Sequence, residues 1–139
     1  RGKGTYRLGF RIVLPHLPNA NANPNKRSGY ARNKKFGMYN AKLAKAKRTD
    51  REEVIATVLE QGRPDRPMKK AHITISWHAK DKRRRDIDNL FAAMKGSIDG
   101  LVDAGVIADD SGQCVPSYSL FYVEGCKKNE TVLDIKETP

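Results

Sequence analysis

A strand that runs directly into a charged heptapeptide constrains the fold of this chain more than any other feature. Ile73, Ile75 and Trp77 alternate with other residues, which is the period of a strand with one buried face. The heptapeptide Arg83-Arg84-Arg85-Asp86-Ile87-Asp88-Asn89 follows, and burying so many charges would be costly. Apolar residues at helical spacing then continue from Leu90 to Val102. The chain must therefore leave a buried strand, expose a charged turn and enter a helix.

The remaining periodicities predict an α+β fold with a mixed β-sheet. Alternating apolar residues indicate further strands at Tyr6–Leu14, Val115–Val123 and Thr131–Ile135, the last two as a closing hairpin. Residues 15–37 form a long basic loop. Helical spacing follows from about Tyr39 to Leu59, with Val54, Ile55, Val58 and Leu59 as the inward stripe. This is either one helix or two, since a capping box at Thr49–Glu52 could start a second. The expected order is β-α-β-α-β-β in a single domain over residues 1–139.

Charge divides the chain into two parts. Residues 1–85 hold 23 Lys and Arg against 6 Asp and Glu, a net charge of +17, whereas residues 86–139 hold 4 against 10. The basic part predicts a polyanionic partner, and the acidic part exceeds what a purely architectural nucleic-acid binder needs. The sequence has no run of 18 apolar residues, so we expect no membrane partner. Cys114 and Cys126 have neither CxxC nor zinc-ligand spacing, so we expect them to be reduced and the protein to be cytoplasmic and DNA-associated. A hydrophobic content of only 38% often accompanies an oligomer.

Four aspartates form a candidate metal site. Asp86 and Asp88 lie two residues apart, and in an extended chain such residues point to the same face and can reach one ion. Asp109 and Asp110 follow the turn expected at Gly105 and could complete the site. Crowded carboxylates repel unless a cation compensates, and hard oxygen ligands suit Mg²⁺, with Mn²⁺ as a substitute. The alternative is a solvated charge run in which Asp88 only caps the helix.

Lys95 is a candidate catalytic residue on the predicted helix. It follows Asp88 by seven residues, which is about two helical turns, so the two side chains share a face. Its ammonium could reach a phosphate beside the metal and stabilise the charge that develops there. The alternative is an i,i+4 ion pair with Asp99 on the helix surface.

Basic residues near the aspartates are candidate DNA contacts. They are Lys80, Lys82, Arg83, Arg84 and Arg85 before the acids, and Lys26, Arg27, Lys34 and Lys35 in the long loop. Binding through such residues releases counterions from phosphates and is therefore strongly salt-dependent.

The motifs RRRDIDNL and DAGVIADDS, with one lysine on the helix between them, resemble the RusA family of Holliday-junction resolvases over about residues 70–125. The resemblance implies a homodimeric, Mg²⁺-dependent endonuclease of phage or prophage type that nicks two opposed strands of a four-way DNA junction. It implies Asp86, Asp88 and Asp110 as metal-binding acids and Lys95 as the catalytic lysine. In the family pattern the lysine comes four residues after the second aspartate, at Ala92 here, and a three-residue insertion would restore Lys95 to register.

Two other functions fit the same residues. A different metal-dependent nuclease, acting on other branched or duplex DNA or on RNA, could use the same acids. A non-catalytic protein that binds junctions or RNA would use the basic part alone and would not need the acids in register.

Overall fold

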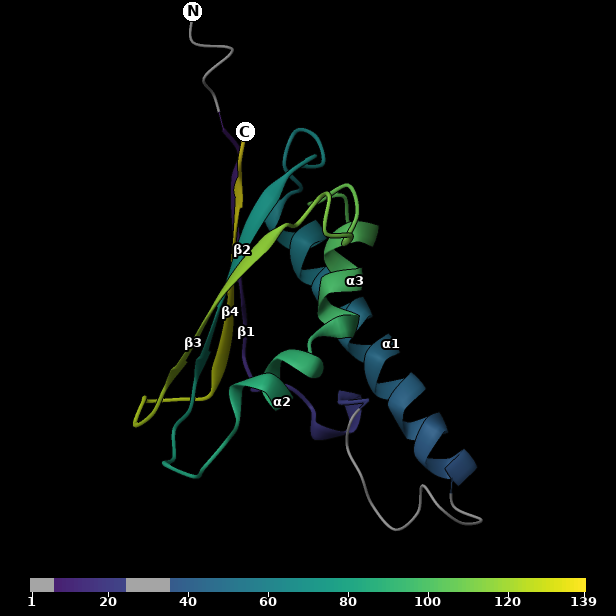
Figure 1. Ribbon diagram of the computed structural model, residues 1–139, viewed down its shortest axis with the longest axis vertical. Helices are drawn as coiled ribbons and strands as arrows, with labels where there is room; N and C mark the ends of the chain where they lie inside the picture. The colour runs from purple at the N-terminus through teal and green to yellow at the C-terminus, as the bar shows by residue number, and fades with distance from the viewer. Residues whose placement is uncertain (1–6, 25–35) are drawn as a thin grey trace, which may run out of the picture.

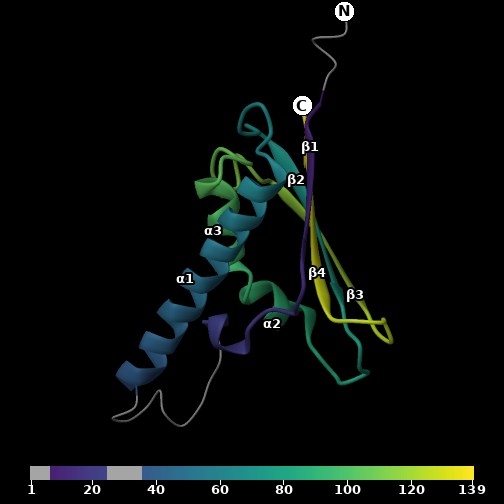
Figure 2. The ribbon, with the colours of Figure 1, turned by 180° about the vertical axis from the view of Figure 1, so that it is seen from behind.

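The computed structural model describes residues 7–24 and 36–139, and its fold is α+β with a mixed four-stranded sheet, as predicted (Figure 1). The elements in chain order are β1 (Gly9–Leu14), the short 3₁₀ helix η2 (Ala20–Ala22), α1 (Phe36–Gln61), β2 (Ala71–His78), α2 (Ile87–Ala92), α3 (Lys95–Asp103), β3 (Ser117–Val123) and β4 (Glu130–Glu137). The helices α1 and α3 cover one face of the sheet, and Figure 2 shows the same two layers from behind. The helix predicted to start at about Tyr39 begins at Phe36, so it includes the last two residues of the loop predicted over residues 15–37.

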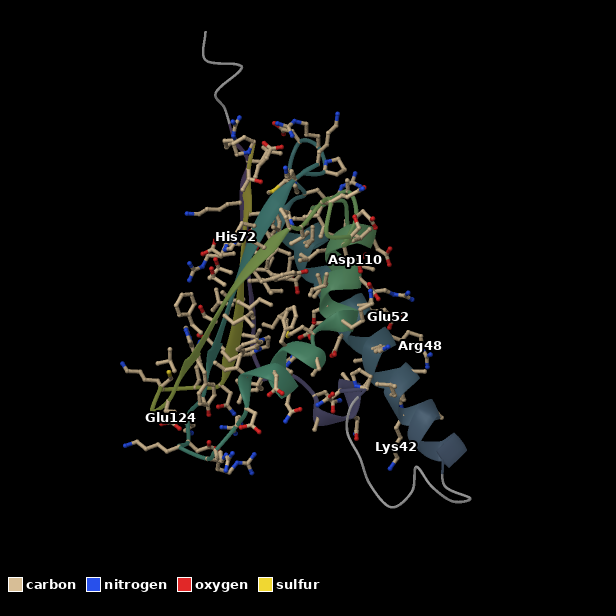
Figure 3. All side chains as sticks on the ribbon, viewed as in Figure 1. Lys42, Arg48, Glu52, His72, Asp110 and Glu124 are labelled. Atoms are coloured by element: carbon tan, nitrogen blue, oxygen red, sulfur yellow. The ribbon has the colours of Figure 1, made fainter. Side chains whose placement is uncertain are left out.

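The core lies between β2 and the two long helices. Along β2, Ala71, Ile73, Ile75 and Trp77 are completely buried, while the residues between them are half-buried on the other face. Figure 3 shows His72 on this second face, away from the helices. Each fully buried aliphatic or aromatic side chain contributes about 1.5–3 kcal/mol, so the predicted alternation of this strand accounts for its central place in the sheet.

One continuous helix, α1, replaces the alternative of two helices. Val54 and Val58 are buried against the core, but Leu59 is 60% exposed, so its predicted inward position is wrong. Gly62, with φ of 98°, ends the helix in the left-handed region that favours glycine. Lys42, Arg48 and Glu52 on α1, which Figure 3 labels, are all exposed. Within the described ranges no helix, α1 included, has the length and apolarity needed to cross a membrane.

The predicted closing hairpin is wrong, because β3 and β4 are separated by β2. The sheet order is β1-β4-β2-β3, with β3 parallel to β2 and β4 antiparallel to both β1 and β2. Parallel strands need a crossover connection, and the two helices α2 and α3 supply it. The turn between β3 and β4 then passes over the end of β2, where Ala79 donates to the Val123 carbonyl and accepts from the Cys126 amide.

The single helix predicted from Leu90 to Val102 is also wrong, because it is divided into α2 and α3. At the division Met94 has φ of −90° and ψ of 0°, and its amide bonds to the Phe91 carbonyl three residues back. Such a bond tightens the turn in the manner of a 3₁₀ helix. The helix axis therefore changes direction just before Lys95 (Figure 1).

Two glycines hold α3 against α1. A Cβ atom on Gly96 would overlap the Lys47 carbonyl oxygen, and one on Gly100 would lie 2.8 Å from the Arg51 carbonyl oxygen. Both neighbours are backbone atoms of α1, which cannot move aside cheaply. The small residues thus allow the two helices to touch through their backbones, and this contact positions the start of α3.

Candidate functional site

Asp86 and Asp88 lie at the start of α2, but their side chains do not share one face as predicted. Asp86 is the N-cap residue, with extended backbone, and its carbonyl accepts hydrogen bonds from the amides of Asn89 and Leu90 at 3.1 Å. Asp88 does not cap the helix, which was the role considered as the alternative to a metal site, because it lies inside the first turn. Residues two apart in a helix do not face each other, so the argument that both carboxylates share one face does not hold.

The two faces of α2 border two different cavities. The larger, of about 800 Å³, has Arg83 and Arg85 in its wall and is called the arginine cavity; its other lining residues are His16, Leu17, Pro18, Ala20, Asn23, Asp86, Asn89, Leu90, Ala93 and Asn129. The smaller, of about 280 Å³, is called the lysine cavity and is lined by Phe91, Ala92, Lys95, Ile98, Asp110 and Tyr118. Asp86 therefore belongs to the arginine cavity. Asp88 precedes Phe91 and Ala92 by three and four residues and shares their face of the helix.

Lys95 and Asp110 meet in the lysine cavity. The Lys95 Nζ lies 2.6 Å from Asp110 Oδ2 and 3.0 Å from Asp99 Oδ1, and Figure 3 shows Asp110 beside α3. The surface pair with Asp99, considered as the alternative role for Lys95, is thus present together with the contact to Asp110. The prediction placed Asp88 and Lys95 on one helix, but Asp88 belongs to α2 and Lys95 is the first residue of α3.

The pKa values of this pair keep both groups charged. The hydrogen bonds to Asp110 and Asp99 raise the pKa of Lys95, and the hydrogen bond from Lys95 lowers the pKa of Asp110. An ammonium has three N–H donors, and the two carboxylates account for two. Lys95 is therefore a permanent cation with one further donor to offer to a ligand.

An aromatic pair forms the apolar wall of the lysine cavity. The rings of Phe91 and Tyr118 pack edge to face with centroids 5.0 Å apart, an arrangement that stabilises by about 0.5–1.5 kcal/mol beyond burial. Burial raises the pKa of the Tyr118 phenol, so it stays neutral. This neutral wall keeps water from one side of the charged pair, whereas the Lys95 side chain is 51% exposed on the other.

The arginines before α2 differ in how firmly they are held. Arg85 makes two hydrogen bonds to Asp81, at 2.7 and 3.2 Å, and a third to the Tyr122 hydroxyl at 2.9 Å; only 15% of its side chain is exposed. Hydrogen bonds from Arg85 lower the pKa of Asp81 to about 2. In contrast, 91% of the Arg84 side chain is exposed, and its Nε lies 3.6 Å from Asp86. Arg85 shapes the loop, whereas Arg84 is available to a partner.

The remaining predicted DNA contacts fall into two groups. Lys80 and Lys82 are exposed, and 76% of the Arg83 side chain is exposed, with its Nε 3.7 Å from Asp81. The cations predicted in the long loop lie outside the described residues; they are Lys26, Arg27, Lys34 and Lys35.

His16 closes the arginine cavity on the side of α1. Its Nδ1 lies 2.8 Å from the Leu17 carbonyl oxygen and its Nε2 lies 2.6 Å from Glu53 Oε1. Burial opposes the charge of His16, but these hydrogen bonds outweigh it and raise the pKa of the ring. Asp50 is buried nearby, and burial raises its pKa to about 6.

The four aspartates fit a hard divalent cation by chemistry but only partly by position. Mg²⁺ is commonly held by one or two carboxylates together with water and substrate phosphates. Within residues 7–24 and 36–139, no three His, Cys, Asp or Glu side chains gather closely enough to hold a metal ion. Asp109 is exposed, and Asp110 is engaged by Lys95. A site with one or two of these carboxylates agrees with the structure, whereas a three-carboxylate site is not formed.

Several residues that line the two cavities, or that hold Arg85 in the wall of one of them, were not singled out from the sequence. The four-residue spacing of Asp81 and Arg85 is a signal from which their ion pair could have been predicted. This spacing is usually considered only within helices, and the segment between the two residues is a loop. Tyr118, Tyr122, His16 and Asn129 come from distant segments and carry no local signal. Their roles depend on strand pairing, which the sequence analysis had assigned incorrectly.

Comparison of the sequence with models of known protein families and with curated proteins finds no significant match in either set.

Proposed function

We propose that this chain is a Mg²⁺-dependent endonuclease that hydrolyses phosphodiester bonds in four-way or other branched DNA. The observation that carries the proposal is the lysine cavity, where the Lys95 ammonium contacts Asp110 at 2.6 Å. Asp88 lies on the face of α2 that borders this cavity, and the exposed Arg84 lies just before that helix. Phosphoryl transfer depends on positioning and on stabilising charge on the phosphate oxygens, and these residues supply both. The RusA resemblance agrees with this assignment.

The reaction joins a water oxygen to phosphorus and breaks one bond between phosphorus and a bridging oxygen. Negative charge then grows on the phosphate oxygens, and Lys95 donates its remaining N–H to one of them. Asp110 and Asp99 keep that ammonium charged and oriented. Arg84, Lys80 and Lys82 bind flanking phosphates. A Mg²⁺ held by one or two of Asp86, Asp88, Asp109 and Asp110 would supply Lewis-acid stabilisation and a more acidic water.

The proposed enzyme acts on DNA in the cytoplasm as a homodimer. Two opposed strands must be nicked to resolve a junction, and a two-fold assembly supplies two sites. Sedimentation at the concentration used for cleavage tests this part of the proposal, and a monomer that still makes paired nicks would contradict it.

The first experiment compares labelled four-way junction, flap and linear duplex, with Mg²⁺, with Mn²⁺ and with excess EDTA. We expect cleavage of the junction with either metal and none with EDTA. Asp88→Asn should lower the cleavage rate by at least about a hundredfold, because it removes one ligand charge from the site. Junction binding, measured by fluorescence anisotropy, should survive this change.

The matched control is Asp65→Asn, an exposed aspartate in the turn between α1 and β2, which should cleave at the wild-type rate. Cleavage in excess EDTA, or full activity of Asp88→Asn, would contradict a metal-dependent nuclease. Equal cleavage of duplex and junction would keep the nuclease but remove its preference for branched DNA.

One observation favours a second candidate, a phosphate-binding protein without catalysis. Two carboxylates already neutralise Lys95, and the described residues form no three-carboxylate group. Such a protein would bind junctions or RNA through Arg84 and its neighbours. It predicts tight binding without cleavage under any metal condition, and Asp88→Asn would then leave binding unchanged or tighten it by removing a negative charge.

A further inference from the structure

We infer that the arginine cavity binds one nucleotide of the DNA, with its base against the apolar part of the cavity wall. Such a pocket presupposes the proposed function, because the nucleotide would belong to the strand being cut. The cavity has about 800 Å³, which is within the range of about 300–1,000 Å³ typical of small-molecule sites. Asp86 is in its wall, so the bound nucleotide would lie next to one of the candidate metal ligands.

One part of the cavity wall is apolar. Leu17 and Pro18 come from the segment after β1, and Leu90 faces the cavity from α2. Leu90 is buried and the other two are half-buried, so the surface is already formed and needs no rearrangement. A flat base can pack against such a wall, and burying its apolar faces stabilises it by about 25 cal/mol per Å².

The polar part of the wall offers donors. The Asn89 Oδ1 accepts a hydrogen bond from Asn23 Nδ2 at 3.4 Å, and the Asn129 Oδ1 accepts one from the Lys80 backbone amide at 2.7 Å. Each amide oxygen thus has one partner, and each side chain retains an NH₂ group that can donate to a ligand. Every base presents acceptors to such donors, which are carbonyl oxygens in guanine, cytosine and thymine and ring nitrogens in adenine.

Positive charge at the cavity suits the phosphate of a nucleotide. Arg83 is mostly exposed, and His16 has both ring nitrogens next to oxygen acceptors. Two acceptors favour the doubly protonated imidazolium, whose charge is paired with Glu53. Among the residues that the structure describes, Asp86 is the only acid in the wall of this cavity, and it lies 3.6 Å from Arg84. Arg85 remains bound to Asp81 and supports the wall without being needed by the ligand.

The test is a titration of the full chain, free of divalent metal, with the four deoxynucleoside 5′-monophosphates and with 2-deoxyribose 5-phosphate, followed by ¹H–¹⁵N NMR. We expect shifts of the backbone amides of Leu17, Asn89 and Asn129. Each of the four nucleotides should bind at least about fivefold more tightly than 2-deoxyribose 5-phosphate, which is the effect of about one hydrogen bond to the base. Asn89→Ala and, separately, Asn129→Ala should each reduce this preference.

The control variant is Gln113→Ala, which removes an exposed amide from a loop outside the cavity and should leave the titration unchanged. Affinity for 2-deoxyribose 5-phosphate equal to that for the nucleotides would overturn the inference, because the cavity would then hold only phosphate. Shifts confined to α1, or no shifts at millimolar concentrations, would also overturn it. Because no cleavage is measured, failure here leaves the endonuclease proposal standing, and absence of cleavage leaves this titration interpretable.

Discussion

The two cavities on either side of α2 differ in how their charges are satisfied. In the lysine cavity the Lys95 ammonium is bound by Asp99 and Asp110, so the cation and its counterions belong to the same chain. At the arginine cavity Arg83 and the nearby Arg84 each face one aspartate at a longer distance, 3.7 Å to Asp81 and 3.6 Å to Asp86, and their side chains are 76% and 91% exposed. A closely paired cation is held in position for chemistry, whereas a loosely paired and exposed cation can exchange its partner for a phosphate. Under the proposed function, the reaction therefore belongs to one side of α2 and recognition of the DNA to the other.

The largest effect on cleavage is expected for a substitution in the lysine cavity. Lys95→Ala should lower the single-turnover cleavage rate by about 30- to 1,000-fold, or roughly 2–4 kcal/mol of barrier, because it removes the donor that stabilises charge on the phosphate. Thermal stability should change little, since Lys95 is half-exposed and exposed pairs contribute only about 0–1 kcal/mol. Quench-flow cleavage and calorimetry measure the two effects.

Lys136→Ala, an exposed lysine on β4, is the control and should cleave normally. Adding Ala92→Lys to the Lys95→Ala variant should restore part of the rate, because Ala92 lines the same cavity. Normal cleavage by Lys95→Ala would show that the lysine serves only its ion pairs.

The second prediction concerns the packing of α3 against α1, which positions the lysine cavity. Gly100→Ala forces a Cβ to within 2.8 Å of the Arg51 carbonyl oxygen and of Val54 Cβ, so α3 must move away from α1. Overpacking of this kind costs about 1–3 kcal/mol, to be measured by urea unfolding. The control is Gly112→Ala, whose Cβ would meet no atom within 4 Å. Equal stability of the two variants would mean that the helices can separate freely.

The third prediction concerns Asp50, a buried acid near the arginine cavity. Burial raises the pKa of Asp50 from 3.8 to about 6, so the folded protein keeps this proton at pH values where the unfolded chain has lost it. The wild type should therefore lose stability as pH rises from about 4 to about 6. Asp50→Asn does not titrate and should be more stable above pH 7, by on the order of 1 kcal/mol, since losing the attraction to His16 offsets part of the gain.

Melting temperatures of Asp50→Asn and wild type, recorded from pH 4 to pH 8, measure this difference. The two curves should converge at low pH, and Asp65→Asn should follow the wild type throughout. A difference that is largest at pH 4 would contradict the raised pKa.

The smallest effect should distinguish the two arginines of the charged turn. Arg84→Ala should reduce the log–log salt slope of junction binding by about 0.9, the loss of one phosphate contact. Arg85→Ala should also lower the melting temperature, because it leaves Asp81 and Tyr122 without their hydrogen-bond donor. Anisotropy at several salt concentrations measures the slope. If neither variant changes affinity or slope, the turn is only a solvated surface.

The sequence periodicity predicted an element correctly where the structure of that element depends on its own residues. The strand at β2, the basic turn after it and the end of α3 at Ala104 and Gly105 could all be predicted, since Gly105 has φ of 83° and only glycine adopts this readily. The site could be predicted as a list of charged residues. Its division between two cavities could not, because that depends on Asp88 being helical and on the axis changing direction at Met94.

The amino-acid sequence alone determined where the strands and most of the helical residues lie, where the charges concentrate and which side of most elements is apolar. These features follow from the 2.0 and 3.6 residue periods and from the cost of burying charge. Only the tertiary structure decided that β2 lies between β3 and β4, that α3 leaves the axis of α2, and that Lys95 meets Asp110. Each depends on residues far apart in the chain, such as the backbone contact between Gly100 and Arg51. Local periodicity shows that an apolar face must be covered but does not specify which segment covers it.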